Sequence, residues 1–202
     1  MTSASRPKTL RELSGLPASP PPLADAILIV IDAQREYLDG RLPLDGIEAA
    51  LDNISRLLTE SRASSGKIVH VLHKGRAGGS FDLDDGGRVI DQVAPVGGEA
   101  VVYKSLPNSF AATELRDVIA GFGDLPVVLT GFMTHMCVSA TARAALDAGL
   151  AATVVGDACA TRPLPSATTS SVLSADIIHE VALSELADRF AIVGSTAQLT
   201  RR

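Results

Sequence analysis

The sequence predicts a three-layer α/β/α fold, in which helices cover both faces of a parallel sheet of about six strands. Apolar, β-branched runs recur along the 202 residues, and segments whose apolar residues have helical spacing separate them. The first runs are continuous rather than alternating, which is typical of strands buried on both faces. With 46% hydrophobic and 20% charged residues, the chain can bury one substantial core.

Residues 1–22 are predicted to form a polar, Pro-rich leader that ends in SPPPL, a run that cannot be helix or central strand. TLRELSG within it predicts one short helical turn. We expect the leader to lie over the domain or across a partner subunit. Residues 23–202 are expected to form a single domain.

The first half of this domain alternates strands with a helix and a loop. AILIVID (26–32) and KIVHVLH (67–73) are apolar, β-branched runs that predict strands. Between them, residues 47–66 end at a glycine and carry apolar residues with helical spacing at positions 47, 51, 54, 57 and 58. A loop rich in Gly and Asp follows, with a short helix around RVIDQV, and VVYK (101–104) is a short strand.

The second half repeats the alternation. A helix over 111–123 stops at a glycine, PVVLTGF (126–132) is a strand, and a helix of small residues follows Cys137. AATVVGDA (151–158) is a strand, residues 175–190 are a helix, and AIVGST is a last short strand. Because helices separate the strands, parallel pairing is expected.

Composition excludes several classes of partner. The net charge is -5 and the chain has no Lys/Arg-rich run, so nucleic acid and anionic membrane surfaces are not expected partners. The longest apolar runs, AILIVI and PVVLT, are far shorter than the roughly 20 residues of a spanning helix. The N-terminal segment has no hydrophobic signal core, and Cys137 and Cys159 are expected to be free thiols, so a cytoplasmic protein is predicted.

Polar residues follow most of the predicted strands. In an open parallel sheet, ligands bind at the carboxyl ends of the strands, near the point where the strand order reverses. We therefore expect the functional site among the polar residues at these ends: Asp32, Gln34, His73, Lys104, Cys137 and Asp157.

Three of these residues suit acid–base and nucleophilic chemistry. At a helix start, a Cys137 thiolate faces free backbone N–H groups, which suits a nucleophile, but a buried cysteine is equally a small core residue. Asp32 either forms a turn or, with a pKa raised by burial, takes the thiol proton. Lys104 is either solvated or keeps Asp32 ionised and favours the thiolate. Position alone leaves these alternatives open.

The segments around these residues resemble one known family. Asp32 in IVIDAQREY, Lys104 in VVYKSLPNSF and Cys137 in LTGFMTHMCVSATARAALDAG are similar to the Asp–Lys–Cys triad of the isochorismatase-like cysteine hydrolases. That family includes nicotinamidases, N-carbamoylsarcosine amidase and ureidoacrylate-type amidases. The resemblance extends over about residues 26–193 and includes GDACAT and ALSELADRFAIV.

The resemblance implies a Rossmann-like sheet in the order 3-2-1-4-5-6 and a cis peptide bond between Phe132 and Met133. It also implies a reaction. Asp32 deprotonates Cys137, the thiolate attacks a carbonyl carbon to form a thioester, and the backbone amides of Met133 and Cys137 form the oxyanion hole. The expected substrate is a small amide or ureido compound whose C–N bond is hydrolysed.

The chain departs from the nicotinamidase pattern, and two alternative functions have to be considered. Nicotinamidases carry an Asp-x-His metal motif, which REYLDGRLPLDG lacks, so no catalytic metal and no cofactor are expected, and nicotinamide is a poor substrate candidate. One rival is an isochorismatase that cleaves a vinyl ether, although such enzymes generally do without the cysteine. The other is a non-catalytic or redox-sensing protein in which peroxide oxidises Cys137.

The pocket around the triad is predicted less sharply. His73 either binds substrate or caps its strand, and His135 is not expected to be the base, because the resemblance assigns that role to Asp32. Cys159 is expected to be a packed small residue. No cation besides Lys104 stands out, which favours a neutral or weakly anionic substrate. A homo-oligomer, dimer or higher, is expected. The predicted substrate contacts are Gln34, Tyr37, His73, Asn108, Phe110, Phe132, Thr134 and His135.

Overall fold

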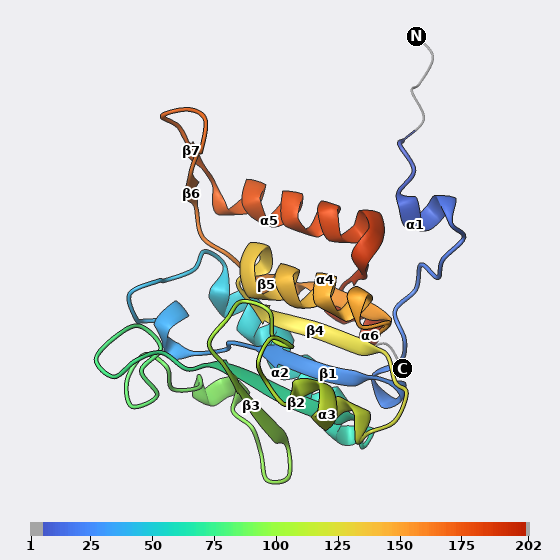
Figure 1. Ribbon diagram of the computed structural model, residues 1–202, viewed down its shortest axis with the longest axis horizontal. Coiled ribbons are helices and arrows are strands. Elements are labelled where there is room, and N and C mark those ends of the chain that lie inside the picture. Colours follow the sequence, from blue (N-terminus) through green and yellow to red (C-terminus); the bar gives the residue numbers. More distant parts are fainter. Residues whose placement is uncertain (1–5, 201–202) are drawn as a thin grey trace.

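The computed structural model describes residues 6–200, and its main sheet has six parallel strands in the order β3-β2-β1-β4-β5-β8 (Figure 1). Since β8 is the sixth strand of this sheet along the chain, the predicted order is confirmed. Residues 1–5 of the predicted leader lie outside the described residues. The strands are β1 (Ile27–Ile31), β2 (Lys67–His73), β3 (Ala100–Lys104), β4 (Val127–Phe132), β5 (Ala152–Ala160) and β8 (Ile192–Gly194).

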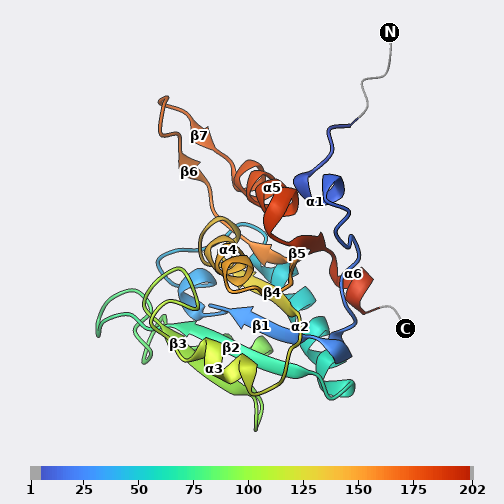
Figure 2. The same ribbon diagram turned by 45° about the vertical axis from the view of Figure 1, so that its right-hand side comes forward.

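Helices cover both faces of the sheet, which confirms the three-layer prediction (Figure 2). Within β1, Leu28 and Val30 belong to a core shared with α2 (Ile47–Ala63) and α6 (Thr196–Leu199). Ile27, Ile29 and Ile31 face the opposite core, because successive side chains of a strand point to opposite faces. That core contains residues of three further elements: α3 (Leu115–Ala120), α4 (Ser139–Asp147) and α5 (Ala175–Glu185).

Several element boundaries differ from the sequence prediction. The helix predicted over 111–123 is only α3, because Ala112 has a φ of 55° and helical backbone begins after it. The helix predicted after Cys137 starts as a π-helical turn, Thr134–Val138, before α4. A similar turn, Leu186–Phe190, extends α5. The short helical turn predicted in the leader is confirmed as α1 (Leu10–Leu13).

A two-stranded antiparallel hairpin between β5 and α5 was not predicted. It consists of β6 (Leu164–Pro165) and β7 (Val172–Leu173), and it projects away from the sheet (Figure 1). Short 3-10 turns complete the secondary structure, at Leu23–Asp25, Arg35–Tyr37 and Asp91–Val93.

Gly131 brings β1 and β4 together beside the predicted site. It has a φ of 111°, and a Cβ at this position would lie 2.0 Å from the Ile31 carbonyl oxygen. The positive φ disfavours any residue with a side chain, and the short distance means that a Cβ would clash with the backbone of Ile31. The glycine therefore lets the ends of the two central strands approach closely.

We expect Gly131→Ala to lower the free energy of unfolding by about 3 kcal/mol or more, since it combines an unfavourable φ with overpacking. Gly123→Ala is the matched control, because Gly123 has a similar φ of 96° but open space where a Cβ would lie. It should lose only about 1–2 kcal/mol. Urea denaturation of both variants measures the difference, and equal losses would show that the close approach to Ile31 is unimportant.

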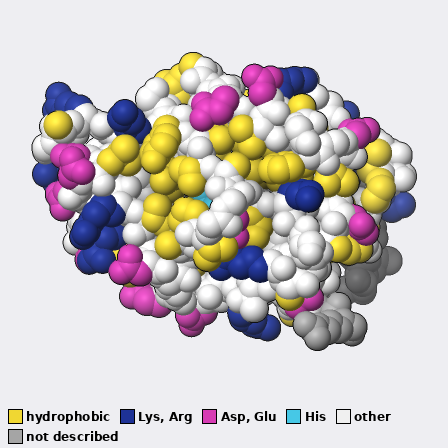
Figure 3. All heavy atoms as spheres, turned by 90° about the horizontal axis from the view of Figure 1, so that it is seen from below, with side chains coloured by type: hydrophobic (Ala, Val, Ile, Leu, Met, Phe, Trp, Pro, Cys, Tyr) yellow, Lys and Arg dark blue, Asp and Glu magenta, His cyan; other side chains and the backbone are white. Residues whose placement is uncertain are grey.

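The surface of the described residues carries mixed charge. In the face shown in Figure 3, Lys and Arg side chains are interspersed with Asp, Glu and hydrophobic side chains. Among the helices of residues 6–200, none has both the length and the apolar character needed to cross a bilayer.

Candidate active site

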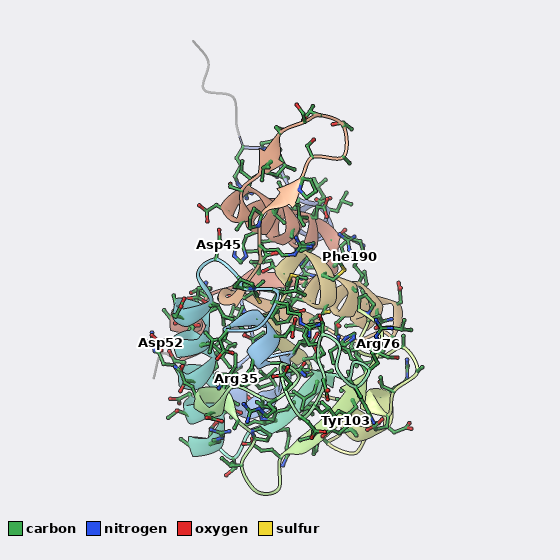
Figure 4. All side chains as sticks on the ribbon, turned by 90° about the vertical axis from the view of Figure 1, so that its left-hand side faces the viewer. Arg35, Asp45, Asp52, Arg76, Tyr103 and Phe190 are labelled. Carbon is green, nitrogen blue, oxygen red and sulfur yellow. The ribbon has the colours of Figure 1, made fainter. Side chains whose placement is uncertain are left out.

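Three strand-end side chains meet at the carboxyl edge of the sheet, which faces the viewer in Figure 4. Asp32 directly follows β1, Lys104 is the last residue of β3, and Cys137 lies in the π-helical turn after β4. Lys104 Nζ is 2.7 Å from Asp32 Oδ2 and 3.3 Å from Cys137 Sγ. The labelled Arg35, Asp45 and Arg76 lie in the loops that follow β1 and β2, around this edge of the sheet (Figure 4).

The backbone after β1 turns sharply at Asp32. Its φ is 50°, a left-handed conformation that aspartate tolerates better than most residues. Its N–H donates to the Val71 carbonyl, and its own carbonyl accepts from the Gln34 N–H, both at 2.8 Å. The residue is thus both a turn former and a member of the buried cluster. Its role as the base stays a prediction.

Asp32 and Lys104 form an ion pair whose side chains are both 0% exposed. Burial raises the pKa of Asp32, as the sequence predicts, while the positive charge of Lys104 opposes that rise. The carboxyl group of Asp32 also shares a side-chain hydrogen bond with the Cys137 thiol. The two groups therefore lie close enough for a proton to pass between them.

The pKa of Cys137 is set by opposing effects. Burial, followed by the negative charge of Asp32, raises the pKa of this thiol to about 12, and Lys104 only partly opposes the rise. Lys104 thus favours the thiolate, as the sequence predicts, but burial and Asp32 outweigh it. Cys137 is therefore a thiol at neutral pH, and its thiolate has to form during a reaction.

The turn before Cys137 begins with the predicted cis peptide bond between Phe132 and Met133, which the structure confirms. The carbonyl of Met133 accepts hydrogen bonds from the N–H groups of Met136 and Val138, at 3.0 and 3.2 Å. This closes the π-helical turn, with Met133 directly before it and Cys137 within it. The oxyanion hole formed by their amides stays a prediction.

Gln34 and Thr134, two of the predicted substrate contacts, have hydrogen-bond partners within the protein. The Gln34 amide donates to the carbonyls of His73 and Gly87, at 2.8 and 2.6 Å, and its oxygen accepts from the His73 N–H. Thr134 Oγ1 donates to the Ala160 carbonyl at 3.1 Å. Both side chains are fully buried, and their role as substrate contacts stays a prediction.

Aromatic side chains pack together next to the triad. Tyr37 makes edge-to-face contacts with Phe132 and Phe81, with 6.0 and 5.1 Å between the ring centres. Phe81 was not identified from the sequence. Burial, and then the negative charge of Asp32, raise the pKa of Tyr37, so its hydroxyl stays protonated.

The remaining predicted site residues have local partners in the structure. Asn108 Oδ1 accepts from the Phe110 N–H at 2.9 Å, so this oxygen stabilises its own loop. Phe110 packs partly buried against the core that contains Cys137. His135 Nδ1 lies 2.6 Å from Thr161 Oγ1, and none of its described hydrogen bonds joins the triad. Asp157, another strand-end candidate, instead accepts from the N–H and hydroxyl of Thr196 at the start of α6.

The structure also brings Arg162 close to the site, which sequence reasoning missed. Burial lowers the pKa of His135, and the positive charge of Arg162 lowers it further. The same charge acts on Tyr37, and the Arg162 Nε is buried without a hydrogen-bond partner among the described residues. The sequence singled out no cation besides Lys104, so this second one was not predicted. GDACATR places this arginine just past a predicted strand, which is the signal that could have found it.

His179 is a second residue that sequence reasoning did not connect to this region. Its Nδ1 lies 2.9 Å from Thr134 Oγ1, at the start of the turn that carries Cys137. Nearby, a cavity of about 160 Å³ is lined by Asp45, Gly46, Cys159, Ala160, Thr161, Ala175, Asp176 and His179. Within residues 6–200, no three His, Cys, Asp or Glu side chains come together as a metal site.

Comparison with known proteins shows the family of the chain. Residues 26–198 match the isochorismatase domain family. The secreted isochorismatase effector Isc1 of Verticillium dahliae is 37% identical, over 95% of this chain and 98% of its own length. The crystal structure of an isochorismatase from Pseudomonas putida KT2440 superposes with a TM-score of 0.91 at 42% identity, over 96% of this chain and all of that one.

A more distant relative is named for amide hydrolysis. The ureidoacrylate amidohydrolase RutB of Serratia proteamaculans is 25% identical, over 63% of this chain and 68% of its own length. The family match covers most of the chain and the fold is the same, so this chain belongs to the isochorismatase family of hydrolases.

Proposed function

We propose that the chain is a cysteine amidohydrolase that cleaves the C–N bond of a small amide or ureido compound. The observation that carries this proposal is the buried Lys104 ammonium, 2.7 Å from the Asp32 carboxylate and 3.3 Å from the Cys137 thiol. A base, a nucleophile and a cation that orients both are the parts that acyl transfer through a thioester requires.

The reaction follows from the protonation states. As Sγ of Cys137 attacks the carbonyl carbon, Asp32 takes the thiol proton, and the amides of Met133 and Cys137 hold the oxyanion. The C–N bond then breaks, and Asp32 returns the proton to the departing nitrogen. Asp32 next removes a proton from water, which attacks the thioester, and Sγ leaves and is reprotonated. Lys104 holds the two groups in place and balances the charge of the carboxylate.

Arg162 gives the substrate class a further feature, an anionic group. A guanidinium with a buried, unpaired Nε matches a carboxylate, which accepts paired N–H donors. A ureido acid or an amide that also bears a carboxylate satisfies both Arg162 and Cys137.

Arg162→Gln is expected to raise KM for such an acid by about 10- to 100-fold, the value of a lost charge-assisted hydrogen bond. KM for the methyl ester of the same compound should stay within about twofold, because that ester lacks the charge. Steady-state kinetics with this matched pair measure the effect. An equal rise for acid and ester would remove Arg162 from substrate recognition.

The proposal is tested by a screen of small amides, ureido acids and N-carbamoyl amino acids for ammonia release. The wild-type protein and Cys137→Ala are run side by side, so that release by a contaminant is subtracted. Release that depends on Cys137 supports the amidohydrolase. Release from no compound, or equal release by both proteins, counts against it.

Vinyl-ether cleavage is a second candidate, because the relatives Isc1 and the Pseudomonas putida protein are named isochorismatases. Isochorismate carries carboxylates that Arg162 could also bind. Pyruvate release from isochorismate that survives in Cys137→Ala supports this candidate and excludes a role for the thiol. A redox sensor fits less well, since sensor cysteines have low pKa values and are accessible, whereas Cys137 is 5% exposed with a raised pKa.

A further inference from the structure

Lys104 has a third partner at the site. An ammonium group has three N–H donors and no acceptor. Besides Asp32 Oδ2 and Cys137 Sγ, the Lys104 Nζ lies 3.4 Å from His73 Nδ1. Because Lys104 can only donate, Nδ1 must be the acceptor in this contact. His73 is therefore neutral while the contact holds, with its proton on Nε2.

His73 is held in place from two sides. Its backbone N–H and carbonyl, at the end of β2, both bind the Gln34 side chain at 2.8 Å. Gln34 is itself anchored to the Gly87 carbonyl at 2.6 Å. The imidazole ring packs against Phe81, with 4.9 Å between the ring centres. A buried amide thus fixes the backbone of His73, and an aromatic contact fixes its ring.

We propose that His73 is a positioning residue, which as a neutral imidazole accepts a hydrogen bond from Lys104 and keeps the ammonium between Asp32 and Cys137. Protonation of the ring removes the acceptor and sets two cations against each other. Lys104 then moves away from the pair, and Cys137 loses the charge that stabilises its thiolate. The proposal rests on the proposed function, in which Lys104 orients the carboxylate and the thiol.

The charges around His73 give the direction of the pH dependence. The charged groups that act on it are Lys104 on β3 and Asp32 after β1. Burial lowers the pKa of His73, Lys104 lowers it further, and Asp32 opposes both. The ring is therefore neutral at pH 7, and the positioning contact is lost as the pH falls through the lowered pKa.

The rate at which iodoacetamide alkylates Cys137 tests the proposal without an amide substrate. Mass spectrometry of the Cys137 peptide gives this rate between pH 4 and pH 8. For any thiol the logarithm of the rate falls with a slope of about one as the pH falls below the thiol pKa. In the wild-type protein the rate should fall by up to about a further tenfold as the pH falls through the His73 pKa, because protonated His73 also displaces Lys104. The slope should therefore exceed one in that interval and return to one below it.

Two variants separate the effect of the hydrogen-bond acceptor at His73 from the effect of ring protonation. His73→Asn keeps an acceptor near the Nδ1 position but cannot be protonated, so its slope should stay near one. His73→Leu has no acceptor, and we expect Cys137 to react about tenfold more slowly at pH 7.5, the equivalent of one pKa unit. A steepening that persists in His73→Asn, or a wild-type rate in His73→Leu, would overturn the proposal.

A measurement on the unsubstituted protein completes the test. Nitrogen-15 chemical shifts of the His73 ring should show a protonated Nε2 and a bare Nδ1 at pH 7.5. The opposite tautomer overturns the proposal whatever the variants do. Failure of the ammonia screen would leave these thiol and imidazole measurements unaffected, so the two proposals fail separately.

Discussion

Cys137→Ala is expected to lower kcat for amide hydrolysis by about 10⁴-fold or more, as removal of a nucleophile does in other hydrolases. The fold should persist, because alanine is small and Cys137 lies in a turn closed by backbone hydrogen bonds. Ammonia release gives the rate, and circular dichroism verifies the fold. The loss follows from the absence of any other thiol beside Asp32 and Lys104 among the described residues.

Cys159→Ala is the matched control for this variant. Cys159 is buried like Cys137, at 6% against 5% exposure, and burial likewise raises its pKa to about 12. The two thiols differ in their partners, since Cys159 lies within β5, paired with Gly131. We expect Cys159→Ala to keep kcat within a few-fold of the wild-type value. A large loss of kcat in Cys159→Ala, with kcat retained in Cys137→Ala, would mean that Cys159 is the nucleophile.

Lys104→Met is expected to destabilise the protein by about 3–5 kcal/mol at pH 7, because it leaves the buried carboxylate of Asp32 without its counter-ion. Adding Asp32→Asn should restore most of that loss, since the double variant contains neither charge. Urea denaturation of both proteins measures the difference. A loss below 1 kcal/mol in the single variant would mean that water or another cation compensates Asp32.

The pH dependence of the single variant follows from the direction of the Asp32 pKa. Burial raises this pKa in the folded protein, and removing Lys104 removes the main opposing charge. The folded state of Lys104→Met therefore takes up a proton more readily than the unfolded state. Its stability relative to the wild type should recover as the pH falls from 7 towards 5. The double variant should show no such recovery.

The fold was largely predictable because its strands are continuous apolar runs. AILIVID contains β1 and KIVHVLH coincides with β2, and such runs are buried wherever a parallel sheet is covered on both faces. Asp32 and Lys104 were predictable for the same reason. A charged residue at the end of a buried strand has few positions other than the carboxyl edge of the sheet.

Other features depend on contacts between distant segments, which no local pattern reports. Gln34 binds His73 and Gly87 across 39 and 53 residues of sequence, so its structural role was invisible in the chain order. Arg162 became a candidate only once β5 placed it beside Tyr37 and His135. The pKa of Cys137 likewise depends on burial and on Asp32 together, and both outweigh the effect of Lys104 that the sequence predicted.

The central claim is that Cys137 forms a covalent thioester with its substrate. Acid quenching during turnover, followed by peptide mass spectrometry, tests it directly with any amide identified in the screen. The Cys137 peptide should gain the mass of the acyl group, which is the substrate less its departing amine, and should lose it when the substrate is exhausted. Turnover with no acyl group on Cys137 at any quench time, or with the acyl group on Cys159, would contradict the account.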